Sequence, residues 1–234
     1  MADRDSVNLE IFGVEGIGEV TEGDDVASMI LEALPGQLQD FDIVVVTHKI
    51  VSKAEGAVRV AATDEDRWAI VQSESASVVR RRGDLTISIT RHGFICANAG
   101  VDRSNVMPGY VVLLPRDPDA SAHRIRRRLE RQTGVSLGVV ITDTFGRPWR
   151  RGLTDVAIGV SGLPSLVDYR GTTDTFGSTL EVTEVAAIDE IASAADLVMG
   201  KATGIPVAVV RGLRLVGDGR ATDLVRPPSE DLFR

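Results

Sequence analysis

The sequence has little sulfur and few aromatic side chains. Cys96 is the only cysteine among 234 residues, and Phe, Trp and Tyr together make up 4%. A single thiol cannot form an internal disulfide, which fits the reducing cytosol. No segment approaches the ~20 apolar residues that a membrane-spanning helix requires, and the acidic start of the chain lacks the apolar core of a signal peptide. The sequence therefore predicts a cytoplasmic protein that does not enter a membrane.

Positive charge is also scarce. The chain has 34 Asp and Glu against 26 Lys and Arg, for a net charge of −8, and only Lys49, Lys53 and Lys201 are lysines. A net negative surface repels a phosphate backbone, so nucleic acid is not an expected partner, although a small anion can still bind locally. Where arginine carries most of the positive charge, each lysine is a candidate for a specific role. A GC-rich coding bias explains the same skew more simply.

Several common nucleotide and metal motifs are missing. The nearest approach to a P-loop is 199–203, where Ala195 stands in place of the leading glycine and Ala202 follows the lysine. The amino-terminal glycines do not have the G-x-G-x-x-G spacing of a Rossmann fold. The three histidines lie far apart in the sequence and form no H-E-x-x-H motif, so a zinc site is not expected.

The remaining composition, 43% hydrophobic and 26% charged, is that of a globular chain long enough for one large domain or two small ones. Apolar periodicity predicts strands at 7–14, 43–46, 85–90, 93–98, 111–115, 137–141, 156–160 and 206–210. It predicts helices after Asp24 and Asp25 and at 64–82, 117–134 and 182–195. Strand pairs such as 85–90 with 93–98 are close enough to be antiparallel neighbours. A mixed α+β fold is therefore expected rather than a doubly wound one.

Two acidic residues stand where apolar strands are expected to end. Asp143 follows one such strand and has Thr144 beside it, and Asp102 follows another. Carboxylates with hydroxyl neighbours can form an all-oxygen site for Mg²⁺ or Mn²⁺, which bind one or two carboxylates and complete their shell with water and phosphate. The simpler interpretation is that each Asp caps a turn or a helix.

Two further segments are candidates for anion binding. Lys53 comes shortly after the 43–46 strand and could reach a phosphate as a mobile point charge, or it could be an ordinary exposed lysine. The glycines in 13–18 could let backbone N–H groups approach an anion or a purine edge, or they could form an ordinary connection.

Taken together, four segments resemble the coenzyme F420-0:L-glutamate ligase family. They are 48–56, 96–105, 141–150 and 152–159, and the resemblance runs in order from about residue 8 to residue 215. Each motif is weak alone, but the ordered set is specific.

The resemblance implies a GTP-dependent ligase that adds L-glutamate to coenzyme F420-0 and then γ-linked glutamate, through an acyl phosphate, with release of GDP and phosphate. It implies an α+β fold with mixed, largely antiparallel sheets and flanking helices, in an intertwined homodimer. It also implies Mg²⁺ or Mn²⁺, two per site, and leaves open whether K⁺ assists. The alternatives are a similar ligase with a different acceptor, or a nucleotide-binding module of a larger enzyme.

The family's functional residues match this sequence at particular positions. By resemblance, Asp102 and Asp143 are the catalytic carboxylates that bind one divalent cation, and Thr144 is a ligand of a second cation. The positions that match nucleotide contacts are Ile17, Gly18, Glu19, Val20, His48, Lys53 and Asn105.

The sequence departs from the family pattern in three places. Lys201 stands where archaeal-type members tend to carry Gln or Glu, so we do not assign it as a metal ligand, and a lysine there could meet phosphate charge. His48 replaces a small hydroxyl or amide residue. We expect a ligase domain over 1–222 and a tail or linker over 223–234, which resembles the point where actinobacterial-type members continue into a nitroreductase-like domain.

Overall fold

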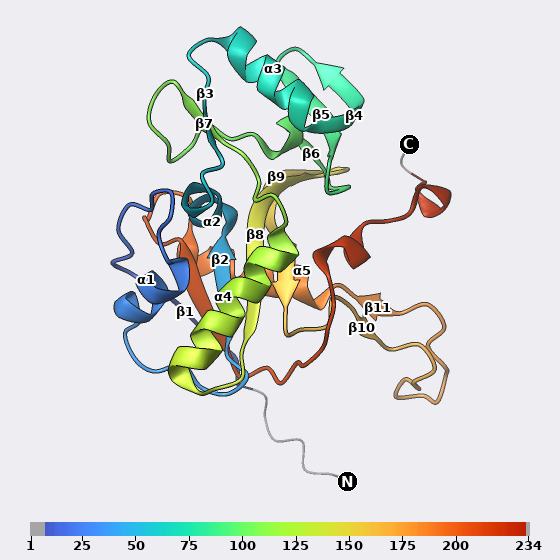
Figure 1. Ribbon diagram of the computed structural model, residues 1–234. Helices are drawn as coiled ribbons and strands as arrows, with labels where there is room; N and C mark the ends of the chain where they lie inside the picture. The colour runs from blue at the N-terminus through green and yellow to red at the C-terminus, as the bar shows by residue number, and fades with distance from the viewer. Residues whose placement is uncertain (1–7, 233–234) are drawn as a thin grey trace.

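The run 43–46 is apolar on both faces and lies in the central strand of the largest sheet in the computed structural model, which describes residues 8–232 (Figure 1). The order of the five strands is β1-β12-β2-β8-β9. β2 pairs in parallel with β8, and the other three pairings are antiparallel. The strands are β1 Glu10–Gly13, β2 Ile43–Thr47, β8 Gly138–Arg147, β9 Arg150–Ser161 and β12 Val207–Arg211.

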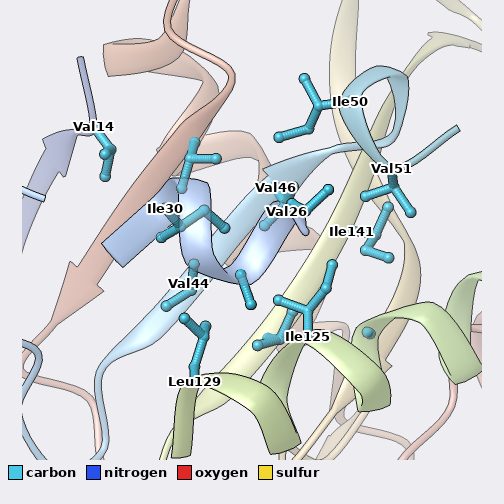
Figure 2. Packing of buried hydrophobic residues seen from close by; sticks show 14 of the residues in the cluster. Val14, Val26, Ile30, Val44, Val46, Ile50, Val51, Ile125, Leu129 and Ile141 are labelled. Atoms are coloured by element: carbon cyan, nitrogen blue, oxygen red, sulfur yellow. The ribbon is translucent and has the colours of Figure 1, made fainter. Parts of the chain in front are cut away.

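Helices cover both faces of this sheet. Because neighbouring strand residues point to opposite faces, Val44 and Val46 pack toward one helical layer, whereas Ile43 and Val45 pack toward the other. The first layer contains α1 Val26–Ala33, α2 His48–Ala54 and α4 Pro118–Thr133, and the second contains α5 Ala187–Met199. Figure 2 shows the first layer, in which Ile30, Ile125 and Leu129 face the side chains of β2 and β8.

Shorter elements form the upper part of the molecule in Figure 1. They comprise a three-stranded antiparallel sheet, a two-stranded sheet and α3, and a separate small apolar cluster lies among them. Their bounds are β3 Val58–Val60, α3 Asp64–Glu74, β4 Ser75–Arg82, β5 Leu85–Thr90, β6 Ile95–Ala97 and β7 Tyr110–Val112. The remaining elements are the pair β10 Val167–Asp168 and β11 Glu184–Val185, and the short helices η1 Asn98–Gly100, η2 Ala221–Leu224 and η3 Pro228–Glu230.

The structure confirms the mixed α+β class with largely antiparallel sheets and flanking helices. It also confirms α4, which begins after the Asp117 cap and ends at Gly134, where φ is 79°. The antiparallel pairing of β5 with β6 is confirmed as well. The expected start of the first strand, Val7, lies outside the described residues, and the domain boundary after residue 222 stays a prediction.

The helix predicted over 64–82 is wrong in its second half. The capping box of Thr63 and Asp66 starts α3 as expected, but α3 ends at Glu74 and the chain continues as β4. β4 pairs with β5 along its length, so strand pairing prevails over the helical spacing of its side chains. Similarly, the helix predicted over 182–195 begins only at Ala187, after the short β11, and continues to Met199.

Asp143 does not follow the end of a strand, as the sequence suggested. β8 extends to Arg147 and pairs with β9, so Asp143 lies within the ladder opposite Val156. Because β8 and β9 pair with each other, β8 extends beyond the apolar run 137–141 and β9 begins before the apolar run 156–160. Conversely, β7 ends at Val112, before the end of the apolar run over 111–115.

Within residues 8–232, no helix is long and apolar enough to cross a membrane.

Candidate functional site

The first turn of α2 brings two side chains to the two carboxylates singled out in the sequence. α2 begins directly after β2. His48 Nε2 lies 3.3 Å from Oδ1 of Asp143, and Lys49 Nζ lies 2.9 Å from Oδ2 of Asp102. Consecutive residues of one short helix therefore hold carboxylates that are 41 positions apart in the chain.

The His48–Asp143 contact is nearly closed to solvent. His48 is 1% exposed and the Asp143 side chain 12%. The second ring nitrogen, Nδ1, lies 3.4 Å from the hydroxyl of Ser52, whereas Nε2 has no aligned hydrogen-bond partner within the described part of the chain. Oδ1 of Asp143 accepts a hydrogen bond from the backbone N–H of Thr144 at 2.7 Å. A buried polar atom without a hydrogen bond is costly, and the nearby carboxylate of Asp143 compensates Nε2 only in part.

Cys96 lies near the same carboxylate but is not suited to react. Burial, and secondarily the negative charge of Asp143, raises the pKa of its thiol to about 12. The thiolate is the nucleophilic and metal-binding form, so Cys96 stays a protonated, structural residue.

Asp102 is held by its own loop as well as by Lys49. Its carboxylate accepts hydrogen bonds from the backbone N–H and the hydroxyl of Ser104, at 2.7 and 2.8 Å. Its backbone forms an antiparallel bridge with Val112. Burial alone would raise the pKa of Asp102, but the Ser104 hydrogen bonds and the Lys49 charge outweigh it and lower the pKa. Asp102 is therefore ionised, as a metal ligand must be.

Lys53 ties α2 to the amino-terminal segment over 17–20. Its Nζ lies 2.5 Å from Oε1 of Glu19; the lysine is buried and the glutamate exposed. Ile17 packs against the core and Val20 is buried in it, so Val20 can offer a ligand only backbone groups. A Cβ added at Gly18 would meet no atom within 4 Å, so packing does not require glycine there.

Asn105 stands apart from these contacts. It is exposed within the loop between Asp102 and β7 and adopts a left-handed backbone with φ of 56°. Asn tolerates this conformation better than most residues, so the turn alone accounts for its presence.

Thr144 belongs to a second cluster, which the sequence reasoning largely missed. Its hydroxyl donates to Oδ1 of Asp155 at 2.6 Å and accepts from Lys201 Nζ at 2.7 Å. Lys201 also donates to Asp155 and Asp196, each at 2.7 Å. The sequence did contain a signal for Asp155, because this acidic residue directly precedes the apolar run of β9. A charge buried at such a position needs partners.

The two clusters lie on opposite faces of β8. Asp143 faces α2, whereas the next residue, Thr144, faces Asp155 and the end of α5. This follows from strand alternation, and the neighbouring core residues agree: Ile141 packs in the α4 layer and Val140 in the α5 layer. The predicted site residues are thus divided between two faces.

The two faces differ in their fit to a divalent cation. Asp102 and Asp143 offer carboxylate oxygens, the donors that Mg²⁺ and Mn²⁺ prefer. The buried Nε2 beside Asp143 lacks an aligned hydrogen bond, which marks an incomplete polar site. Among residues 8–232, no group of three or more His, Cys, Asp or Glu side chains is arranged to hold a metal. Water and substrate oxygens would therefore complete the coordination. At Thr144 the hydroxyl and its carboxylate neighbour are already engaged by Lys201, so this position does not fit a second cation.

Comparisons with known proteins all point to one family. A family model described as F420-0:gamma-glutamyl ligase matches residues 16–212. The chain is similar to the coenzyme F420:L-glutamate ligase of Methanopyrus kandleri, with 44% identity over 238 residues that cover 92% of this chain and 94% of that protein. It is 43% identical to the protein of the same name from Methanothermobacter thermautotrophicus over 251 residues, 97% of this chain and all of that protein. The Archaeoglobus fulgidus protein of this name is 40% identical over 245 residues, 97% of each chain. The chain therefore belongs to the F420-0:gamma-glutamyl ligase family and is a ligase that forms carbon–nitrogen bonds.

Proposed function

We propose that this ligase adds L-glutamate to coenzyme F420-0 in a GTP-dependent reaction in the cytoplasm, and then adds γ-linked glutamate to the product. The observation that carries the proposal is similarity over nearly the whole chain to proteins named coenzyme F420:L-glutamate ligase. The site supports it with two carboxylates beside basic side chains of α2, and without a reactive nucleophile.

The proposed reaction has two steps. The terminal carboxylate of F420-0 attacks the γ-phosphorus of GTP, the bond to the bridging oxygen breaks, and GDP leaves. The amine of glutamate then attacks the carbonyl carbon of the acyl phosphate, forms the C–N bond, expels phosphate and loses a proton. Phosphoryl transfer depends mainly on positioning and on neutralising charge. A protonated Cys96 is compatible with this chemistry because no covalent enzyme intermediate is needed.

The carboxylates of Asp102 and Asp143 are the proposed ligands of Mg²⁺ or Mn²⁺. When bound there, the cation supplies positive charge that neutralises the phosphates and the developing negative charge. His48 and Lys49 orient these carboxylates from α2.

The nucleotide is proposed to lie along the segment over 17–20 and the adjoining side of α2. Ile17, Gly18 and Val20 would contact the nucleotide through backbone groups, because their side chains are packed in the core or absent. Lys53 reaches the same region but is engaged by Glu19 at 2.5 Å. Phosphate would compete with the exposed Glu19 for this buried lysine, which can pivot on its flexible stem. Asn105 is proposed as a further nucleotide contact from the Asp102 loop.

A homodimer is part of the proposal. The strongly exposed large apolar side chains include Trp149 and Leu153 at the β8–β9 hairpin, at 83% and 68%, and Phe176 in the loop between β10 and β11, at 95%. Apolar side chains of this size at the tips of hairpins favour burial against a second chain. Light scattering after gel filtration measures the mass, and a monomer at all concentrations would contradict this part.

Mass spectrometry tests the activity directly. The purified protein is incubated with F420-0, GTP, L-glutamate and Mn²⁺, with and without K⁺. The expected result is a mass increase of one and then more glutamate residues, with GDP formed in proportion. Replacing glutamate by aspartate or lysine, and GTP by ATP, defines the amine donor and the nucleotide. An unchanged mass of F420-0 in the presence of folded protein would overturn the proposal.

A further inference from the structure

Lys201 forms an unusually complete set of contacts for a half-exposed lysine. Its ammonium donates to Thr144 Oγ1, Asp155 Oδ1 and Asp196 Oδ1, each at 2.7 Å. The three oxygens come from β8, β9 and α5, and Lys201 itself follows the end of α5. An ammonium group has three N–H donors, so every one of them is used.

The charges of this cluster hold the ammonium in its protonated form. Burial alone would lower the pKa of Lys201, but hydrogen bonds and charge attraction from Asp155 and Asp196 outweigh it and raise the pKa. The carboxylate of Asp155 is itself buried, at 4% exposure. A buried carboxylate needs a paired charge, and Lys201 supplies it.

The same contacts fill the oxygen ligands that a cation would use at this position. Oδ1 of Asp155 accepts from both Thr144 and Lys201, and Oδ2 accepts from Thr142 at 3.1 Å. The Thr144 hydroxyl donates its proton to a hydrogen bond with Asp155 and accepts one from Lys201. A divalent cation at Thr144 would have to displace these bonds while lying close to a fixed positive charge.

We infer that the ammonium of Lys201 takes the place of a second divalent cation, so that each site holds one such cation, at Asp102 and Asp143. This inference rests on the metal assignment in the proposed function. It replaces the expectation of two divalent cations per site by one cation and one tethered ammonium, on opposite faces of β8. The Lys201 charge is then always present, whatever the concentration of free metal.

The number of bound metal ions tests the inference without any catalytic readout. Equilibrium dialysis against Mn²⁺, with GDP at the same concentration in both compartments, gives the manganese bound per chain. The wild-type protein is expected to bind one Mn²⁺. Lys201→Gln should bind two, because it frees Thr144, Asp155 and Asp196 and adds an amide oxygen. Two ions per wild-type chain would overturn the inference, as would a single ion in both proteins.

Matched controls separate the loss of Lys201 from the loss of a positive charge. Arg170→Gln also removes a cation that contacts two carboxylates, Asp168 and Glu184, but on the remote β10–β11 hairpin. It should bind one Mn²⁺, as should Lys201→Arg, which keeps the charge in place. Circular dichroism checks that each variant is folded. If Lys201→Gln does not fold, the wild-type protein still tests the inference, because two Mn²⁺ bound per wild-type chain would overturn it.

The turnover assay distinguishes failure of this inference from failure of the proposed function. Ligation of glutamate by a wild-type protein that binds two Mn²⁺ would preserve the function and reject the role of Lys201. If Lys201→Gln binds two Mn²⁺ and the wild type one, but F420-0 is not turned over, the role of Lys201 is supported and F420-0 is rejected as the substrate. A wild-type protein that binds no Mn²⁺ would reject both this inference and the Asp102–Asp143 metal assignment.

Discussion

Lys49 Nζ lies 2.9 Å from Oδ2 of Asp102, so a lysine that the sequence left unassigned neutralises one of the two proposed metal ligands. The preceding residue, His48, contacts the other ligand, Asp143. Both carboxylates thus have a basic side chain of α2 beside them before any cation binds. This arrangement stabilises the site in its free form, and it makes Lys49 a competitor of the metal for Asp102.

Lys49→Gln is expected to bind Mn²⁺ more tightly in the absence of nucleotide. The partly exposed ion pair is worth at most about 1 kcal/mol, so the dissociation constant should fall by roughly two- to fivefold. The pKa of Asp102 should rise because it loses the Lys49 charge that helps to lower it. Titration of free Mn²⁺ by electron paramagnetic resonance measures the affinity. Lys49→Arg, which keeps the charge, should bind as the wild type does, and weaker binding by Lys49→Gln would contradict the competition.

Asp143→Ala is expected to slow ligation strongly while the protein stays folded. Removing a metal ligand that also orients a buried histidine should lower kcat by about a hundredfold or more, in line with the loss of one strong electrostatic contact to the reacting group. The matched control is Cys96→Ser, which removes a neighbour of Asp143 that takes no part in the proposed chemistry. Turnover of F420-0 is followed by mass spectrometry, and thermal unfolding checks the fold. Near-normal turnover by folded Asp143→Ala would contradict the assignment of Asp143 as a metal ligand.

Local patterns predicted the elements that depend on nearby residues. The apolar, β-branched run 43–46 lies in the buried β2, and Asp117 and Gly134 mark the ends of α4. Their structure follows from burial and capping, which a short window of sequence contains. The helix expected over 64–82 was wrong because pairing of β4 with β5 determines its second half, and a helical spacing of apolar residues does not reveal that partner.

The site was only partly visible in the sequence for a similar reason. Asp102, Asp143 and His48 were singled out from motifs and resemblance, and in the structure the first turn of α2 contacts both carboxylates. The partners of Thr144 were not singled out, because Asp155 and Lys201 become its neighbours only through the β8–β9 hairpin and the position of α5. Which face of β8 a residue occupies depends on register, and a pattern of residue types does not fix register alone.

Cys96 is expected to be unreactive in the folded protein. With its pKa raised to about 12 by burial and by the charge of Asp143, on the order of one thiol in ten thousand is ionised at pH 8. Reaction with a disulfide reagent at pH 8 should be slow and should become rapid in urea. Asp143→Asn should speed the reaction in the folded state because it removes one cause of the raised pKa. A rate in native protein equal to that in urea would contradict the burial of this thiol.

Asp189 and Asp119 hold β9 from its two sides, and their pKa values predict a pH dependence of stability. Asp189 at the start of α5 accepts a hydrogen bond from the backbone N–H of Ala157 at 2.9 Å, and Asp119 at the start of α4 accepts one from Val160 at 2.8 Å. These N–H groups flank an irregularity in the pairing of β9 with β8, where the ladder does not satisfy them. Burial raises the pKa of both carboxyls, although the hydrogen bonds oppose it.

Asp189→Asn is therefore expected to gain stability relative to the wild type as the pH rises. The raised pKa means that the folded state holds the proton more tightly than the unfolded state, so this group's stabilising contribution is full below the ordinary pKa of 3.8 and is lost as the pH rises through the folded value. Asparagine does not titrate and can still accept from Ala157. Urea unfolding between pH 3.5 and pH 7 gives the free energy of unfolding of both proteins, and Asp189→Ala, which loses the hydrogen bond, should be less stable than Asp189→Asn throughout. If the wild-type protein instead becomes more stable relative to Asp189→Asn as the pH rises, the hydrogen bond from Ala157 outweighs burial in setting the pKa of Asp189.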